Sequence, residues 1–513
     1  MNNYNSHKED KITITDNDVI KYLKEIPNIE KSYLVGGAVR DIVLKKNIKD
    51  YDLVVQPDFF STILQGFVDS KASVFCLDKA RNYYRIITYP ARKGQTRLQI
   101  DIISLEANDL KTDLSYRDFT INAIALPMKY FITGEVYKDN FFDPFNGMVH
   151  LDQKFLAPVL KNKTFRDDPA RIIRAFRFMS QGFLPVKGLY SMIEQEKSGL
   201  KSIPSERIFQ ELFPILEDDE LKERLGETKQ DFITLNKMSE LDLWGVIFSS
   251  EGSKNEKNRL FSTFKLSQEL LLELEKWFSE ITELIQGELF GKDLTYFKWL
   301  VWFSIFTEAQ HEDKTKLESG FKVWEELSDF LWSFNYRFPV PKKQKNYACH
   351  YIEGYRLQEN YRNEESLTKL LAKSILAKVP DTAEKEYFFV LGQVSAVKLK
   401  SLKSRVGEKS YDREYDLLKQ EIEHRLEYLK HAKGKLWQIR KEIDGEYVLS
   451  FFDRVPGPWL SDVLSRVHYS LLVDLLQKSN LSDELTHVDI KALGKKAILK
   501  IKESEGLGGE RYS

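Results

Sequence analysis

The sequence predicts an α+β domain at its N-terminal end, with a mixed sheet and helices, followed by a long all-α region. Runs rich in β-branched and aromatic residues are confined to the first 155 residues, at Tyr33–Val35, Tyr51–Val55, Tyr84–Tyr89 and Arg97–Ile103, with a helical stretch around Phe59–Asp69. After about Lys161 these strand signals nearly vanish, and amphipathic helical patterns continue to the C-terminus. The two patterns together indicate a small mixed domain that carries a helical body.

The length of the chain favours several domains. At 513 residues, about three or four hydrophobic cores are expected. We predict a head over residues 1–155, a helical neck over 156–220, a helical body over 221–340 and a helical tail over 341–513.

The cysteine and histidine content limits which metal sites and disulfides the chain can form. The two cysteines, Cys76 and Cys349, are far apart and form no Cys-x-x-Cys pair, and none of the eight histidines belongs to a His-Glu-x-x-His motif. A disulfide framework and a thiolate zinc site are therefore excluded, and a metal site would have to be built from carboxylates.

Hydropathy and charge indicate where in the cell the protein is expected and which partners it can bind. No apolar run approaches the roughly 18 to 20 residues that span a bilayer, and residues Met1–Asp16 are polar, so we expect a cytoplasmic protein without membrane contact. The net charge of −1 argues against a uniformly basic DNA-binding surface, and no DNA partner is expected. The 77 lysines and arginines still allow a local phosphate-binding face.

A glycine turn follows the first predicted strand. Gly36 and Gly37 come directly after Val35, and an apolar-patterned helix with Arg40 near its start comes next. Glycine allows the backbone to approach a ligand closely, and free N–H groups at a helix start favour phosphate. A nucleotide triphosphate could therefore lie on this turn beside Arg40, although such a turn alone is usually only a turn.

Three aspartates supply the predicted catalytic and metal-binding groups. Asp50 and Asp52 lie at i and i+2 at the start of a strand and so project from one face, which a cation or a solvated strand end would explain. Asp101 is the charged residue in an otherwise apolar strand, where burial without a partner would be costly. Carboxylate oxygens suit Mg²⁺, and two such ions would clamp an attacking 3′-hydroxyl and a leaving pyrophosphate. The three residues therefore predict nucleotidyl transfer.

At this point the sequence resembles the class II nucleotidyltransferases, which comprise tRNA CCA-adding enzymes and bacterial poly(A) polymerases. The matching motifs follow one another over residues 31 to 215 in the family's order: Gly36-Gly37-x-x-Arg40-Asp41 with Asp50-x-Asp52, then Asp101, Arg117-Asp118-Phe119-Thr120-Ile121-Asn122, Asp143-Pro144-Phe145-Asn146-Gly147, Asp167-Asp168-Pro169-Ala170-Arg171 with Arg174, and Pro204-Ser205-Glu206-Arg207 with Glu211. The resemblance implies a nucleotidyltransferase head, a base-selecting helix in the neck and an RNA-binding tail. It also implies the tRNA 3′ end, CTP and possibly ATP as partners.

The resemblance assigns nucleotide contacts residue by residue. Gly36, Gly37 and Arg40 would hold the triphosphate. Arg117, Asp118 and Asn122 belong to the motif that contacts the ribose. The implied cofactor is Mg²⁺, as two ions held by Asp50, Asp52 and Asp101.

The base-selecting segment also has an interpretation from its spacing. Asp168, Arg171 and Arg174 recur at i, i+3 and i+6, on neighbouring turns of one helix face. Asp168 could accept from the exocyclic amine of cytosine or adenine while Arg171 donates to the ring, which would reject guanine and uracil. The alternative is a surface salt bridge.

The neck motif Pro204-Ser205-Glu206-Arg207 predicts the start of a second helix. Ser205 is the expected N-cap, with Glu206 in the first turn. Arg207 and Glu211 form an expected ion pair at i, i+4, and the role of the segment is structural.

Two departures from the family bear on specificity. Tyr116 stands where many members carry an additional arginine before Arg117. Only residues 102 to 116 separate Asp101 from Arg117, where family members that add A usually have a longer flexible loop. CC addition is therefore placed first, full CCA addition second and poly(A) addition third.

Two readings from other classes remain. A catalytically inactive RNA-binding protein could keep the fold, but Asp50, Asp52 and Asp101 are all present. A small-molecule nucleotidyltransferase would share these carboxylates but would not need the neck motifs or the long helical region.

Overall fold

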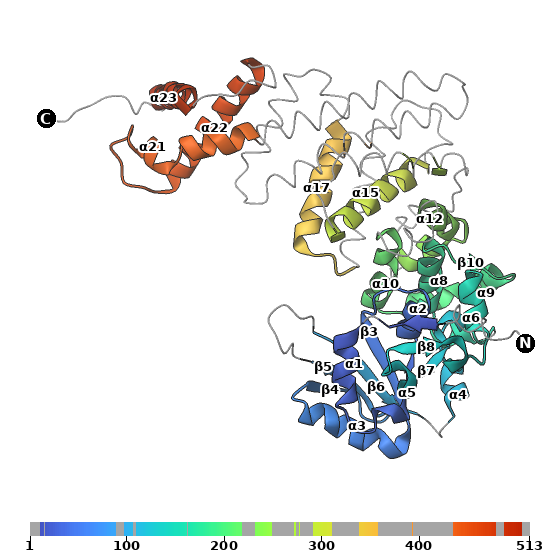
Figure 1. Cartoon of the computed structure of the whole chain (residues 1–513). Helices are drawn as coiled ribbons and strands as arrows, with labels where there is room; N and C mark the ends of the chain where they lie inside the picture. The colour runs from blue at the N-terminus through green and yellow to red at the C-terminus, as the bar shows by residue number, and fades with distance from the viewer. Residues whose placement is uncertain are drawn as a thin grey trace, which may run out of the picture. The chain divides into compact units, whose positions relative to one another are not determined.

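The computed structural model describes residues 11–14, 16–88, 97–105, 109–161, 163–217, 231–248, 271–272, 276, 291–309, 338–357, 392, 395, 434–478 and 487–504. The chain forms two compact units, Met1–Lys254 and Asn255–Ser513 (Figure 1). The division of the chain into head, neck, body and tail stays a prediction.

A six-stranded mixed sheet is the centre of the first unit. Its strands run in the order β4-β5-β6-β3-β2-β7 and are β2 (Ser32–Val35), β3 (Asp50–Val55), β4 (Ser73–Asp78), β5 (Tyr83–Ile87), β6 (Gln99–Ser104) and β7 (Ala125–Pro127). Neighbouring strands are antiparallel except β3 and β6, which are parallel. Two small sheets accompany it, β1 (Lys11–Thr13) with β8 (Glu135–Tyr137) and β9 (Phe155–Leu156) with β10 (Leu184–Pro185). The four predicted strands are present as β2, β3, β5 and β6, and Tyr89, the last residue of the strand predicted at Tyr84–Tyr89, lies outside the described residues.

Both faces of this sheet are covered at its centre. Leu53, Val54 and Val55 are consecutive residues of β3, and all three are buried. Successive side chains of a strand point to opposite faces, so a continuous buried run means that helices or loops cover each face. Helix α2 (Gly37–Val43) contacts β2 and β3, α5 (Met128–Phe131) contacts β2, and α3 (Pro57–Asp69) contacts β4. Helix α1 (Asn17–Lys24) precedes the sheet.

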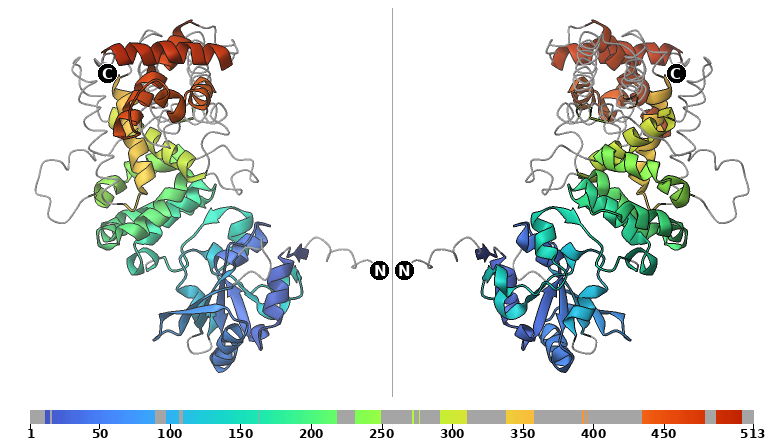
Figure 2. Two further views of the ribbon diagram at one scale, coloured as in Figure 1. Left: turned by 90° about the vertical axis from the view of Figure 1, so that its left-hand side faces the viewer. Right: turned by 90° about the vertical axis from the view of Figure 1, so that its right-hand side faces the viewer.

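Helices follow the sheet within the first unit. They are α4 (Leu110–Ser115), α6 (Gly147–Asp152), α7 (Thr164–Asp167), α8 (Ala170–Ser180), α9 (Leu189–Glu196), α10 (Ser205–Leu212), α12 (Asp231–Glu240) and α13 (Leu243–Phe248). Helix α8 contacts α10 and α12, and Figure 2 shows these green helices stacked together beyond the end of the blue sheet. A short 3₁₀ helix, η3 (Thr120–Asn122), contacts α2 and α6.

The described part of the second unit is helical. It contains α15 (Gly291–Ala309), α17 (Lys342–Leu357), α21 (Gly445–Leu449), α22 (Pro458–Lys478) and α23 (His487–Ser504). Helices α21 to α23 share a core that includes Ile443, Val467, Leu471 and Ile498. The predicted fold class, a mixed α+β head followed by an all-α region, is confirmed. Across the ranges described, no helix is both long and apolar enough to cross a membrane.

Candidate active site

The glycine turn between β2 and α2 forms one wall of the candidate site. Gly36 has a φ of +72° and caps α2, a conformation that favours glycine. A Cβ on Gly36 would lie 2.8 Å from Nη1 of Arg117 and 3.0 Å from Oδ2 of Asp52. These two side chains therefore converge on the Gly36 backbone. A Cβ on Gly37, the first residue of α2, would lie 3.5 Å from Nη2 of Arg40.

The parallel pairing of β3 and β6 brings two of the predicted carboxylates together. Asp52 is the register partner of Asp101, and Asp50 precedes Asp52 by two residues on the same strand. Burial raises the pKa of the Asp52 carboxyl above its ordinary value. The nearby charge of Arg117 lowers this pKa, while Asp101 and Asp50 raise it further. The three carboxylates are thus close enough to interact electrostatically.

Asp101 is held by a residue that the sequence analysis missed. Arg85 on β5 is its register partner on the other side, and Nε and Nη2 of Arg85 donate to Oδ1 and Oδ2 of Asp101 at 2.8 Å each. The hydroxyl of Tyr83 donates to Oδ2 at 3.1 Å. Asp101, 9% exposed, therefore has the partners that its burial requires. Arg85, Asp101 and Asp52 form one row across three strands, termed the carboxylate row below.

The donor set suits a hard divalent cation, but the side chains are not arranged around one. In the described ranges no three His, Cys, Asp or Glu side chains are grouped so that they could hold a metal ion. Both oxygens of Asp101 accept hydrogen bonds from Arg85, whereas three acidic groups interacting electrostatically favour a cation between them. The strand register fixes Asp52 and Asp101 as neighbours, whereas their side chains can change direction when a cation binds.

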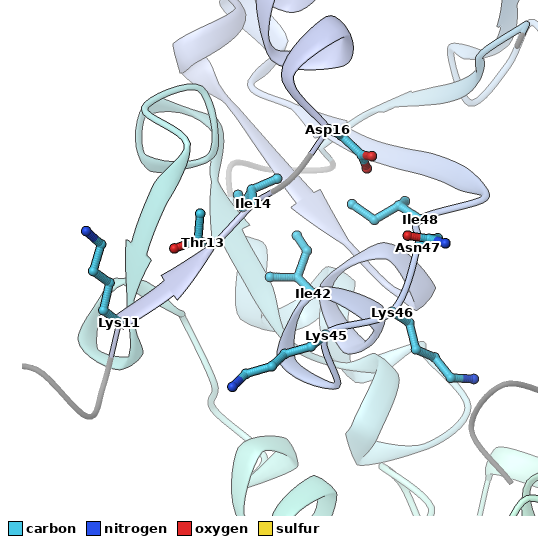
Figure 3. A pocket seen from close by; sticks show the side chains of 9 residues that line it. All are labelled: Lys11, Thr13, Ile14, Asp16, Ile42, Lys45, Lys46, Asn47 and Ile48. Carbon is cyan, nitrogen blue, oxygen red and sulfur yellow. The ribbon is translucent and has the colours of Figure 1, made fainter. Parts of the chain in front are cut away.

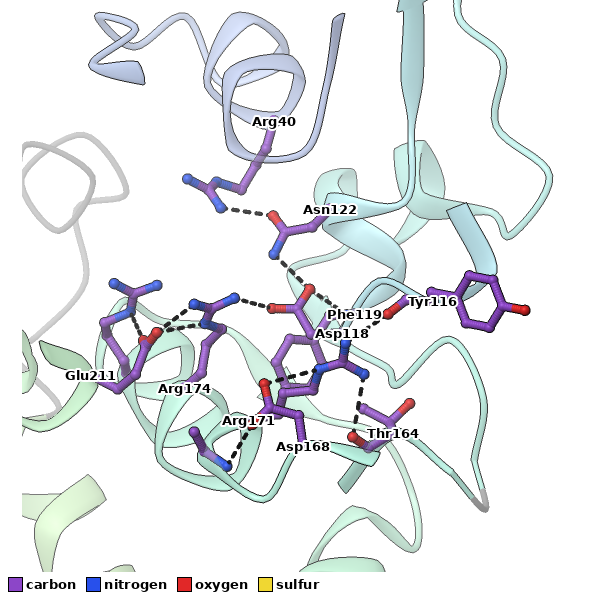
Figure 4. A network of polar contacts seen from close by, with 12 residues as sticks. Arg40, Tyr116, Asp118, Phe119, Asn122, Thr164, Asp168, Arg171, Arg174 and Glu211 are labelled. Carbon is purple, nitrogen blue, oxygen red and sulfur yellow. Dashed lines mark hydrogen bonds and ion pairs between the residues drawn. The ribbon is translucent and has the colours of Figure 1, made fainter. Parts of the chain in front are cut away.

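A second polar cluster joins the head to the helices that follow it (Figure 4). Nη1 of Arg40 donates to Oδ1 of Asn122 at 2.7 Å, and Nδ2 of Asn122 donates to Oδ1 of Asp118 at 3.0 Å. Nη1 of Arg174 in α8 donates to Oδ2 of Asp118 at 3.0 Å, and Nε of Arg174 donates to Glu211 of α10 at 2.8 Å. We call these five residues the bridging network.

Charge is balanced within the bridging network. Asp118 is 5% exposed, and burial alone would raise the pKa of its carboxyl. The positive charge of Arg174 and the hydrogen bonds from the Asn122 amide and the Phe119 N–H stabilise the ionised carboxyl more than burial destabilises it. The pKa of Asp118 therefore lies below its ordinary value. Burial lowers the pKa of Arg174, but Asp118 and Glu211 raise it above its ordinary value. Asp118 and Arg174 therefore each stabilise the ionised form of the other.

The structure changes the interpretation of the base-selecting segment. Asp168 does not lie on the helix with Arg171, because its backbone is extended and α8 begins at Ala170 after Pro169. Oδ1 of Asp168 accepts from the Ala170 N–H at 3.2 Å, so the residue helps to cap α8. Its Oδ2 lies 3.9 Å from Nε of Arg171, which keeps the two charges adjacent as predicted.

The two arginines of this segment have different partners. Nη2 of Arg171 donates to the main-chain carbonyl of Tyr116 at 2.6 Å, and its Nη1 donates to that of Thr164 at 3.3 Å. Arg174 belongs to the bridging network instead. Arg171 and Arg174 therefore lie three residues apart in α8 as predicted but have different partners, and the predicted common helix face is wrong for Asp168, which lies outside the helix.

Two predictions about the neck helix are wrong. Pro204, not Ser205, is the N-cap of α10, and no side chain caps its first turn. Arg207 does not pair with Glu211, because its Nη2 donates to Oδ2 of Asp168 at 2.7 Å while Glu211 binds Arg174. Glu211 is 8% exposed, so its partners come from the helix against which it is buried rather than from its own surface.

A separate pocket lies on the opposite end of α2 from the glycine turn. Its volume is about 310 Å³, and it is lined by residues of β1, by Ile14 and Asp16 after that strand, and by residues between Ile42 and Ile48, with lysines at its rim (Figure 3). The predicted site residues are not part of its lining.

Comparison with known proteins agrees with this geometry. Residues 32–157 match the model of the poly A polymerase head domain. The chain is 37% identical over 191 residues to the multifunctional CCA protein of Xanthomonas euvesicatoria, which covers 36% of this chain and 44% of that protein. It is 31% identical over 188 residues to the CC-adding tRNA nucleotidyltransferase of Shouchella clausii, covering 36% and 44%. These matches thus span less than half the length of each relative.

Solved structures extend the likeness in fold. The structure of a CCA-adding enzyme with ATP matches with a TM-score of 0.53 at 18% identity, over 96% of this chain and 99% of that one. The Thermotoga maritima CCA-adding enzyme with tRNA matches with a TM-score of 0.52 at 18% identity, with the same coverage. Residues 32–157 therefore match the poly A polymerase head domain, and 36% of the chain is similar in sequence to a multifunctional CCA protein and to a CC-adding tRNA nucleotidyltransferase.

Proposed function

We propose that the protein adds C, or C and A, to the 3′ end of tRNA by nucleotidyl transfer from CTP or ATP, with release of pyrophosphate. The observation that carries the proposal is the pairing of Asp52 with Asp101 on adjacent parallel strands, with Asp52 facing the glycine turn at Gly36. This arrangement supplies acidic groups and an open backbone at one place. One matched relative is named a CC-adding tRNA nucleotidyltransferase and another a multifunctional CCA protein, which supports tRNA as the substrate.

Residues of this chain have distinct roles in the proposed reaction. The RNA 3′-oxygen forms a bond to the α-phosphorus of the nucleotide, the bond from that phosphorus to pyrophosphate breaks, and the hydroxyl proton is lost to solvent. Asp50, Asp52 and Asp101 would hold two Mg²⁺ ions. Bound there, the ions would neutralise phosphate charge and make the 3′-hydroxyl easier to deprotonate. Gly36 and Gly37 leave room for the triphosphate.

Arg40 and Arg117 supply positive charge on either side of this turn. Arg117 reaches Gly36 and lowers the pKa of Asp52, so its charge already lies where triphosphate and carboxylates would meet. Arg40 is fixed by Asn122 and by Asp41, to which its Nε donates at 3.0 Å. We propose that Asp118 and Asn122 act beside them by positioning Arg40 toward the nucleotide, with Arg174 holding Asp118 in turn.

Base selection is assigned to Asp168 and Arg171, which lie next to one another at the start of α8. To pair with a base, Asp168 would exchange its contact with Arg207, and Arg171 its contact with the Tyr116 carbonyl. Both contacts are with groups at the protein surface rather than with the core, because Arg207 and Tyr116 are exposed. The cytosine or adenine edge would take their place.

The short segment between Asp101 and Arg117 favours CC addition over full CCA addition, and poly(A) addition is the third candidate. Three tRNAs, ending before CCA, after C and after CC, would be offered with Mg²⁺ and either CTP or ATP. Extension by CTP alone, and no extension of the CC-ending tRNA by ATP, is the expected result. ATP addition to the CC end would assign CCA addition, and long A tails on any RNA would assign the polymerase. Failure to extend any substrate would contradict the proposed function.

A further inference from the structure

Arg85 has no role in the reaction as proposed, yet it makes the strongest side-chain contact in the carboxylate row. Its guanidinium fork meets both oxygens of Asp101 at 2.8 Å. Paired forks of this kind are directional as well as strong. The side chain of Asp101 is 11% exposed and that of Arg85 is 38% exposed, so the pair lies at the edge of the sheet interior, open to solvent on the arginine side.

This contact uses much of the hydrogen-bond acceptor capacity of the Asp101 carboxylate. An ionised carboxylate offers about four lone-pair sites on its two oxygens. Two accept from Arg85 and a third accepts from the hydroxyl of Tyr83. A metal ion at Asp101 would therefore meet a carboxylate whose lone pairs are largely used and a positive charge already beside it.

The position of Arg85 in the sheet keeps its positive charge next to the Asp101 carboxylate. Strand register places Arg85 beside Asp101 and Asp101 beside Asp52, so the guanidinium of Arg85 stays within reach of the Asp101 carboxylate. Tyr83, two residues earlier, lies on the same face of that strand and supports the same carboxylate.

We propose that Arg85 is a positioning residue that holds Asp101 through its fork and competes with a divalent cation for that carboxylate, which keeps cation binding to the free protein weak. The inference rests on the proposed function, because it takes Asp101 to be a metal ligand. A nucleotide would offset the competition, since its phosphate oxygens add negative charge and further ligands.

The test measures binding of Mn²⁺ to the full-length protein without nucleotide or RNA, from the loss of the free-ion electron paramagnetic resonance signal. R85Q removes the charge and keeps one donor, and we expect Mn²⁺ to bind about tenfold more tightly than to the wild type, as for one unit charge a few ångströms away at the edge of a protein. R81Q is the matched control. Arg81 precedes β5, is exposed and pairs only loosely with Asp78 at 3.9 Å, so its loss should leave the affinity within about twofold.

Two further variants locate the effect. In a D101N background, R85Q should give no gain in affinity, because the proposed competition acts through the Asp101 carboxylate. R85K keeps the charge but not the fork, and its affinity should lie between those of the wild type and R85Q. This conservative variant also tests the inference if R85Q lowers the thermal unfolding midpoint too far for titration.

The outcomes separate the inference from the proposed function. Unchanged or weaker Mn²⁺ binding in R85Q and R85K, together with wild-type binding that D52N abolishes, would overturn the role of Arg85 alone. A gain that persists in the D101N background would also overturn it. No binding by either the wild type or R85Q would overturn the metal-dependent function and the inference together.

Discussion

The carboxylate row and the bridging network both pair aspartate with arginine but differ in how their charges are balanced. In the row, burial and neighbouring acidic groups raise the pKa of Asp52, although Arg117 and Arg85 oppose them. In the network, Arg174 and two hydrogen bonds outweigh burial and lower the pKa of Asp118. Ionised Asp118 is therefore stabilised by the fold, whereas ionised Asp52 is disfavoured by it. A site that the fold leaves short of positive charge is suited to a cation from solution.

Neutralising Asp52 should have the largest effect on activity and should not weaken the fold. We expect D52N to lose about 10³-fold or more of CTP incorporation, because the substitution would remove a proposed metal ligand together with its charge. Its unfolding free energy should stay the same or rise, since the removed charge was disfavoured. Incorporation of labelled CTP into tRNA and urea unfolding would measure the two quantities. D58N, in the exposed first turn of α3, is the control, and turnover near that of the wild type in D52N would refute the assignment.

Neutralising Asp118 should weaken the fold itself. D118N leaves Arg174 without one of its two counter-charges, and we expect a loss of about 3 kcal/mol in unfolding free energy, as when one partner of a buried pair is removed. Urea unfolding of the whole chain would measure it against D139N, which changes an exposed carboxylate. A stability equal to that of D139N would remove the distinction between the two clusters.

Removing the Asp168 carboxylate tests a region that belongs to neither cluster. D168A should lower discrimination between CTP and UTP by about tenfold, as for loss of one base-edge contact, while tRNA affinity changes less. Single-turnover incorporation of each nucleotide and filter binding of tRNA give the two numbers. Glu196→Gln, which changes a carboxylate paired with the exposed Arg166, is a suitable control. Discrimination against UTP equal to the wild-type value would argue against base selection by Asp168.

The smallest expected effect is the pH dependence of the stability that Asp118 contributes, and it tests the difference between the bridging network and the carboxylate row. Because the folded-state pKa of Asp118 lies below its ordinary value of 3.8, its charge contributes stability above that pH. The contribution is lost as pH falls through the lower, folded-state pKa. The difference in unfolding free energy between the wild type and D118N should therefore be constant near neutral pH and shrink below about pH 4. A difference that grows on acidification would contradict the sign of this shift.

The sequence was a good guide where function depends on local order. The strands, the glycine turn and the spacing of Asp50 and Asp52 all follow from short patterns, and they lie where those patterns predict. The ion pair predicted between Arg207 and Glu211 is absent because the partners of Glu211 are set by packing between helices and not by local sequence order. Helical spacing describes an isolated helix, whereas Glu211 is buried against α8 and takes its partners from there.

Arg85 shows a different limit of sequence reasoning. Its strand was predicted, but its contact with Asp101 depends on which strands are neighbours and on their register. A charged residue between Tyr84 and Ile86, in a strand otherwise rich in apolar and aromatic residues, was the available signal. Only the pairing of β5 with β6 identifies its partner.

The contacts of Arg40 have a consequence for the entropy of nucleotide binding. Its guanidinium donates to Asp41 and Asn122 and lies 5.3 Å from the centre of the Phe178 ring. Ordering a long side chain of this kind costs up to about 2 kcal/mol of rotamer freedom. Here folding has already restricted the side chain before a nucleotide arrives. An arriving triphosphate would meet a cation with little freedom left to lose, so more of the attraction between them would appear as affinity.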